Sequence, residues 1–173
     1  MQEAKGMKLR IYTWPEQILR KRCKDVLIVD DETRNILSEM YALMKIHKGI
    51  GLAANQAGIN LRLIVVEAED KVFKLVNPQI TKREGRIALK EGCLSFPGLE
   101  LEVKRAKKVW LSALSEKGEP IDIEAEDVLA VAFQHEIDHI NGIEFIDRIS
   151  FWQKFKVLPQ LKKIKRRTVE RNR

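Results

Sequence analysis

A five-residue segment in the last third of the chain has the composition of a metal site: His-Glu-Ile-Asp-His, residues 135–139. Residues four apart on a helix lie one above the other, so the imidazoles of His135 and His139 would project from one face and bind one ion. Glu136 lies next to the first histidine, close enough to move a proton of a water at that ion. The alternative is a helix with two half-buried histidines, but the apolar residues before the motif favour a buried site.

Two imidazoles leave a tetrahedral site one protein ligand short, if a position is to stay open for water. No histidine follows His139, and Glu144 is the nearest acid behind it. Cys93, in the segment Glu-Gly-Cys-Leu-Ser, is the better candidate, because a thiolate is a good ligand for iron, zinc or nickel. A lone cysteine is more often structural, and we expect this for Cys23, which has no motif around it.

Residues 49–56 form a glycine-rich segment that reads Gly-Ile-Gly-Leu-Ala-Ala-Asn-Gln. The segment lacks the Lys-Ser/Thr ending of a phosphate loop, and no strand-to-helix context fits a dinucleotide fingerprint. Taken alone, it could be a helix terminus that packs closely on a sheet. Gln56 is the one polar side chain in it that is suited to donate a hydrogen bond to a developing oxyanion.

The three segments together resemble, in the same order, the three motifs of peptide deformylases. Those motifs are Gly-x-Gly-aliphatic-Ala-Ala-x-Gln, Glu-Gly-Cys-Leu-Ser and Gln-His-Glu-x-Asp-His, and the resemblance extends from about residue 11 to residue 150. It implies an enzyme that removes the formyl group from the N-terminal methionine of nascent polypeptides. One departure is Asn55, where most relatives have proline, and we expect it to loosen the turn without touching the chemistry.

The resemblance also implies the role of each matching residue. It implies three ligands for a metal, usually Fe²⁺ in this family, with Zn²⁺ or Ni²⁺ able to replace it: Cys93, His135 and His139. Glu136 would take a proton from the attacking water and give it to the leaving amine. Gln56 and the backbone N–H of Leu94 would bind the formyl oxygen and stabilise the tetrahedral intermediate.

The substrate cleft is predicted in two ways. The resemblance implies that Ile50, Gly51 and Gly92 line it and pair with the substrate backbone as an added strand. Helix geometry places three further residues on the His135 side of their helix, where they could form an apolar pocket for methionine or simply belong to the core: Val128, Val131 and Ala132.

Two weaker interpretations concern the surroundings of the metal ligands. Asp138 could orient a ligand or face solvent. Arg105 could pair with Glu91 and hold the cysteine loop, and a solvated surface arginine is the alternative.

The remaining sequence predicts an α+β fold, in which antiparallel sheets pack around a central metal-binding helix and a C-terminal helix follows. Helical spacing and capping residues predict helices at about 31–47, about 126–140 and from Ser150 onward. Aliphatic runs predict strands at 61–66 and 72–76, and a turn between 109–114 and 121–123 predicts a hairpin. The apolar face of the last helix is expected at Phe151, Phe155 and Leu158, before Pro159.

The charge of the chain is concentrated at its end. Residues 150–173 carry nine Lys or Arg and one acid, whereas the other 149 residues sum to −1. We therefore predict a catalytic domain over 1–149 and a basic C-terminal helix or tail of the same domain over 150–173. Because deformylases act on nascent chains, the run from Lys162 to Arg173 is expected to bind the ribosome through its RNA.

No apolar run is long enough to span a bilayer, and no signal peptide is evident, so the sequence predicts a cytoplasmic protein. An internal methionine, Met7, leaves open that residues 1–6 are a cloning remnant or a disordered arm. Two rival functions remain: a zinc peptidase built on the His-Glu-x-x-His helix alone, and a non-enzymatic RNA-binding protein on the same fold. The first predicts that activity survives replacement of Cys93, and the second predicts a decayed site.

Overall fold

The computed structural model describes residues 9–68 and 70–172, and the two alternatives for residues 1–6 lie outside this range. Its seven strands are β1 (Gly51–Ala53), β2 (Leu63–Ala68), β3 (Lys71–Glu84), β4 (Ile87–Gly92), β5 (Glu100–Arg105), β6 (Lys108–Leu114) and β7 (Pro120–Glu126). The α-helices are α1 (Asp31–Ile46), α2 (Asp127–Ile140) and α3 (Phe151–Arg171), and the 3-10 helices are η1 (Gln17–Arg20), η2 (Ala54–Ala57) and η3 (Phe145–Asp147).

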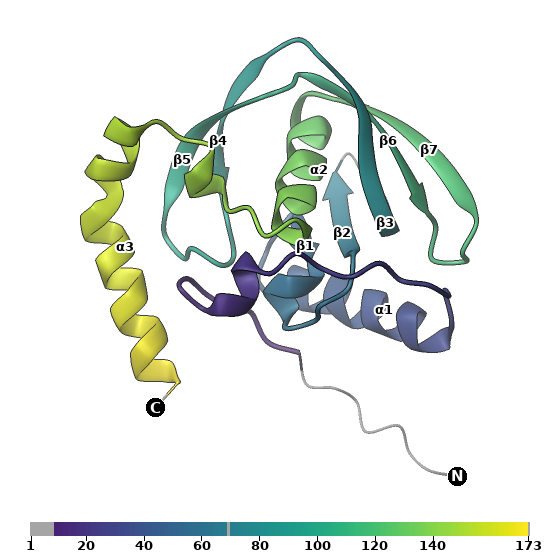
Figure 1. Ribbon diagram of the computed structural model, residues 1–173, viewed down its shortest axis with the longest axis horizontal. Helices are drawn as coiled ribbons and strands as arrows, with labels where there is room; N and C mark the ends of the chain where they lie inside the picture. The colour runs from purple at the N-terminus through teal and green to yellow at the C-terminus, as the bar shows by residue number, and fades with distance from the viewer. Residues whose placement is uncertain (1–8, 69, 173) are drawn as a thin grey trace.

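All strand pairs are antiparallel, in one five-stranded sheet of order β1-β2-β3-β6-β7 and a separate β4–β5 hairpin. Figure 1 shows α2 between the hairpin on one side and the larger sheet on the other, with α1 and α3 on the outside. The predicted α+β class with a central helix is confirmed.

Strand β2 shows why the core has two layers. Successive side chains of a strand point to opposite faces. Ile64 and Val66 accordingly pack in the cluster that contains α2, and Leu63 and Val65 pack in the cluster that contains the buried face of α1. Both sides of the strand are thus covered by helices, which is why its sequence is a continuous apolar run rather than an alternating one.

The ends of α1 and α2 agree with the sequence prediction. The Asp30 side chain accepts a hydrogen bond from the backbone N–H of Thr33 at 2.9 Å and so caps α1. The twelve residues from Leu129 to Ile140 are all buried, because α2 is enclosed on several sides. This enclosure removes the histidines of α2 from bulk water.

The strand prediction was incomplete around the middle of the chain. The hairpin of residues 109–114 and 121–123 is confirmed as β6–β7, but β3 runs to Glu84, beyond the predicted end at residue 76, with two register irregularities against β6. Hairpin β4–β5 was not predicted. Strand β5 does alternate between exposed charged residues and buried ones, which is a strand signal that the prediction missed. Strand β4 reads Ile-Ala-Leu-Lys-Glu-Gly and has no such alternation, so the sequence offered no second strand for a hairpin.

The apolar face of α3 was wrongly assigned. Phe151, Phe155 and Leu158 are 73%, 63% and 42% exposed, whereas Leu161, Ile164 and Thr168 are buried. Leu161 and Ile164 pack with residues around β5 and η3. The helix also continues through Pro159. Proline has no N–H for the carbonyl four residues earlier, but this turn is exposed, so that carbonyl can bind water instead. No helix of the described residues is long and apolar enough to cross a membrane.

Candidate active site

A cleft of about 860 Å³ opens between α2, the start of β1 and the end of the β4–β5 hairpin. The residues predicted to contact substrate all lie along it: Ile50, Gly51, Gly92, Val128, Val131 and Ala132. Gln56, Cys93, Leu94, His135 and Glu136 line it as well. Segments that are far apart in the sequence therefore meet at one cavity.

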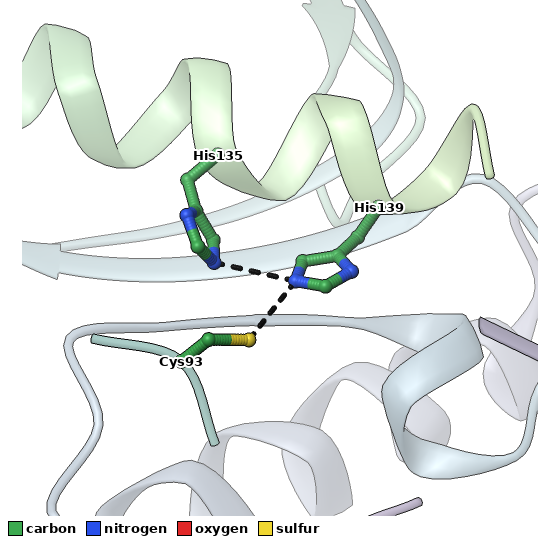
Figure 2. A group of neighbouring side chains, drawn as sticks. All are labelled: Cys93, His135 and His139. Atoms are coloured by element: carbon green, nitrogen blue, oxygen red, sulfur yellow. Dashed lines mark hydrogen bonds between the residues drawn. The ribbon is translucent and has the colours of Figure 1, made fainter. Parts of the chain in front are cut away.

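Three metal-binding groups converge beside this cleft. His135 and His139 lie one turn apart on α2, and Cys93 follows directly after β4 (Figure 2). The Nε2 atoms of the two histidines are 3.2 Å apart, and the Cys93 Sγ lies 3.2 Å from the His139 Nε2. All three ligand atoms lie within 4.8 Å of one another. Glu144, the other acid considered, is not part of this group and pairs with Arg20 instead.

These residues fit a divalent metal ion. At tetrahedral angles, two nitrogen donors at ~2.1 Å from an ion are about 3.4 Å apart, and a sulfur donor at ~2.3 Å lies about 3.6 Å from such a nitrogen. The separations observed around His139, 3.2 Å for both pairs, are close to these values. One thiolate and two imidazoles also leave a fourth position free, which is typical of catalytic rather than structural sites. His139 faces the other two ligand atoms with its Nε2, which is therefore its ligand atom. Its other ring nitrogen, Nδ1, has no hydrogen-bond partner among the described residues.

A buried network orients His135. Its Nδ1 lies 2.8 Å from Oε2 of Glu91, so a proton on Nδ1 leaves the lone pair of Nε2 free to face the other ligands. Arg105 holds the same carboxylate through Nε and Nη2, at 2.5 and 2.9 Å. Burial alone would raise the pKa of Glu91, but the hydrogen bonds from His135 and Arg105 outweigh it and lower this pKa. Glu91 is therefore an ionised partner of the histidine.

The pair of Arg105 with Glu91 was one of two open interpretations, and it is the one observed. Asp138 is buried and contacts Arg105 and Arg148 rather than a histidine. Its hydrogen bond to Arg105 links it to His135 through Glu91. The sequence suggested Glu91 as a partner of the arginine but did not suggest that it holds His135, although its position two residues before Cys93 offered a signal.

Glu136 lies at the edge of the metal-binding group and is only 4% exposed. Burial raises the pKa of its carboxyl to about 7, against the lowering effect of the charges on His135 and Arg105. Among the residues that the structure describes, none hydrogen-bonds to its Oε2 atom. A carboxylate that is buried, unpartnered and beside a metal site is available to exchange a proton.

Gly51 is required by the position of Glu136. A Cβ atom at Gly51 would overlap Oε1 of Glu136 and lie 2.9 Å from its Cγ, so the carboxylate would have to move. For the formate release that the resemblance implies, we expect Gly51→Ala to lower kcat/KM by about 10²-fold, since a displacement of about 1 Å can have that effect. Metal content should stay unchanged because no ligand is touched. Full activity in a metal-loaded Gly51→Ala protein would show that the position of this carboxylate is not critical.

The amide of Gln56 is held in one orientation. Its Oε1 accepts from the backbone N–H of Ala53 at 2.9 Å, and its Nε2 lies 3.1 Å from Oγ of Ser95 and 3.4 Å from Sγ of Cys93. Leu94, whose backbone N–H was predicted to act with Gln56, lines the cleft next to Cys93. The amide nitrogen therefore faces the metal-binding group.

Asn55 has a part that the sequence did not suggest. Its side chain is fully buried, and its Nδ2 donates to the backbone carbonyl of His139 at 2.6 Å. Rather than loosening the turn, this amide ties η2 to the C-terminal end of α2. Phe145 was missed as well: its ring meets that of His135 edge to face, with centroids 5.8 Å apart. A single apolar residue in a loop gives no signal of such a contact.

The family model described as polypeptide deformylase matches residues 8–155 of the chain. A peptide deformylase of Aquifex aeolicus is 41% identical over 160 residues, which cover 89% of this chain and 95% of that protein. One of Wolinella succinogenes is 42% identical over 166 residues, covering 91% and 98%.

Solved structures agree with the sequence comparison. The crystal structure of a peptide deformylase from Legionella pneumophila superposes with a TM-score of 0.85 at 37% identity and covers 92% of this chain and 96% of that one. The structure of the enzyme from Thermus thermophilus gives 0.86 at 34% identity, with 91% and 98% covered. The chain therefore belongs to the peptide deformylase family, the metal-dependent hydrolases that remove the N-terminal formyl group from nascent peptides.

Proposed function

We propose that this chain carries out deformylation with Cys93, His135 and His139 as metal ligands and with Glu136 as the group that moves protons. The observation that carries the proposal is the convergence of the three ligand atoms within 4.8 Å, at a cleft that Glu136 also lines. A divalent ion held there would acidify water and so supply a nucleophile at neutral pH.

The remaining steps belong to side chains of the protein. Glu136 accepts a proton from the attacking water and delivers it to the leaving amine, for which its buried position and raised pKa are suited. The Nε2–H of Gln56 and the backbone N–H of Leu94 stabilise the negative charge that develops on the formyl oxygen. Hydrogen bonds from donors that the fold already holds in place need no reorganisation as that charge forms.

The cleft supports the proposed mode of substrate binding. Strand β1 lies at the edge of the five-stranded sheet, with only β2 beside it among the described residues, so Gly51 offers backbone groups to an extended peptide. The Ile50 carbonyl already accepts from the backbone N–H of Glu67 at 2.8 Å, so Ile50 would contribute its N–H. Val128, Val131 and Ala132 on α2 give the wall an apolar surface for the methionine side chain. A formyl group is the smallest acyl group, so a confined metal site excludes bulkier ones.

We propose Fe²⁺ as the native ion, with Zn²⁺ or Ni²⁺ as substitutes. One thiolate and two imidazoles accept all three ions. The experiment that tests the activity is formate release from a formyl-Met tripeptide by protein purified without oxygen and loaded with each ion in turn. Cleavage of internal peptide bonds without formate release would instead support the zinc peptidase.

The basic tail supports a second proposal, binding to the ribosome, and with it a cytoplasmic location beside the emerging chain. The side chains of Lys162, Lys163, Lys165, Arg166 and Arg167 are all exposed. The same helix is anchored to the body by Leu161, Ile164 and Thr168. The division into a catalytic part, 1–149, and a tail, 150–173, stays a prediction, and this anchoring shows that removing the tail would uncover apolar core.

A charge variant therefore tests the tail better than a deletion. We expect replacement of Lys162, Lys163, Lys165 and Arg166 by glutamine to weaken binding to ribosomes about tenfold or more at 0.1 M salt, and to flatten its salt dependence. Cosedimentation over a salt series measures both. The matched control replaces four exposed lysines of the body, Lys71, Lys82, Lys107 and Lys117. Equal binding by the two variants would contradict a specific role of the tail.

A further inference from the structure

We propose that Ser95 is a positioning residue for deformylation, because its buried hydroxyl holds the Gln56 amide with one N–H group directed at Cys93 and the cleft. The inference rests on the role of Gln56 in the proposed function. Ser95 is fully buried and does not belong to the three-residue metal group, and its hydroxyl lies 3.1 Å from the Gln56 Nε2.

The Gln56 amide can take only one orientation. Its Oε1 accepts from the backbone N–H of Ala53 at 2.9 Å. Turning the amide over would place its NH₂ group against that N–H, donor against donor, and would place its oxygen 3.4 Å from the Cys93 sulfur. The orientation with nitrogen toward Ser95 and Cys93 is therefore the one that satisfies every partner.

Ser95 determines which N–H group remains for the reaction. A glutamine amide has two N–H donors. The Ser95 Oγ accepts one of them, and the other is directed toward the Cys93 Sγ, where the cleft begins. Without this acceptor, the terminal torsion of Gln56 would be held by the Ala53 contact alone, and such torsions are broad.

The backbone around Ser95 is itself fixed. The Ser95 carbonyl accepts from the N–H of Trp14, and the Gln56 carbonyl accepts from the N–H of Tyr12, at 2.9 and 2.8 Å. One short segment of the chain thus joins the two loops that carry the hydroxyl and the amide. The N–H of Phe96 also bonds to the Cys93 carbonyl at 2.9 Å, which closes a tight turn around Ser95. The hydroxyl is therefore held on a rigid support.

The first test is Ser95→Ala, measured as formate release per bound metal ion. Loss of one positioning hydrogen bond should lower kcat about tenfold. The KM should stay within about twofold and metal content should not change, because Ser95 belongs neither to the residues that line the cleft nor to the metal-binding group. A residue that only stabilises the fold would lower the melting temperature without changing kcat per loaded site.

A double-mutant cycle makes the test decisive. Gln56→Ala alone should lower kcat by ~10²–10³-fold, as is usual for the loss of one oxyanion donor. If Ser95 acts through Gln56, adding Ser95→Ala to Gln56→Ala should lower kcat no further. Any general weakening of the fold would persist in the double variant, so the cycle separates the two effects even where Ser95→Ala is less stable.

The matched control is Thr33→Val, which removes another buried hydroxyl, the one that donates to Asp30 at 2.9 Å at the start of α1. It should lower the melting temperature and leave kcat unchanged. A further tenfold loss in the double variant, or an unchanged kcat in Ser95→Ala, would overturn the proposal. Parental activity in Gln56→Ala would contradict the proposed role of Gln56 at the formyl oxygen. This outcome differs from failure of the proposed function, because the parent protein would still release formate.

Discussion

Glu136→Gln is expected to lower kcat for formate release by ~10³-fold, because an amide cannot accept the proton of the attacking water. The substitution keeps the shape of the side chain, so substrate binding and metal content should stay close to those of the parent. Stability should not fall, since the change removes a buried carboxylate whose Oε2 has no hydrogen-bond partner among the described residues. Steady-state kinetics, metal analysis and thermal unfolding on one preparation measure all three.

Two outcomes would contradict this interpretation of Glu136. Activity within tenfold of the parent would show that another group moves the proton. Loss of activity together with loss of metal would show that Glu136 supports the site rather than the reaction. A Glu102→Gln variant, at an exposed position on β5, provides the matched control for the chemical change and should retain full activity.

Cys93→Ala is expected to remove the metal and the activity together. The thiol is the only ligand of the proposed site that lies outside α2, so its loss leaves two imidazoles that cannot close a tetrahedral shell. Metal affinity should fall by more than the 10–100-fold that is typical of losing a residue that only hydrogen-bonds to a metal ligand. Metal analysis after dialysis against a mild chelator, followed by the formate assay, measures both losses.

The other cysteine of the chain provides the control. Cys23 is buried in the core between α2 and the large sheet, away from the cleft, and burial raises the pKa of its thiol to about 11. Cys23→Ala should therefore keep its metal and its kcat. If Cys93→Ala retained both metal and activity, the third ligand would lie elsewhere, as in the zinc peptidase that the His-Glu-x-x-His segment alone would predict.

Local geometry explains which parts of the site were predictable. His135, Glu136 and His139 lie on one helix, where the 3.6-residue period sets their relation without help from the rest of the fold. Residue chemistry made Cys93 and Gln56 candidates, but only the resemblance to a family implied that they act together with these three residues. In the structure, Cys93 lies 46 residues before His139 in sequence and yet 3.2 Å from it. Such a distance depends on how β4 and η2 pack, which spacing within one segment does not reveal.

The residues that hold His135 in place were also only partly predictable from the sequence. The sequence left open whether Arg105 meets Glu91 or water. The only hint that Glu91 holds His135 was its position two residues before Cys93. Whether an ion pair between distant residues is buried depends on packing, and exposed pairs contribute little. The hairpin β4–β5 performs this burial: Glu91 lies on β4 and Arg105 on β5, and both carry less than a tenth of their surface in water.

The sequence by itself predicted the chemistry that we propose, with its three ligands and its proton-moving carboxylate, and it determined the central helix and the basic C-terminal segment. Only the tertiary structure decided which surfaces are covered. In α3, Phe151 and Phe155 are as apolar as Leu161 and Ile164, yet the first pair faces solvent and the second packs on the body. The physical reason is that periodicity defines the faces of a helix, whereas burial depends on which face meets a partner of complementary shape.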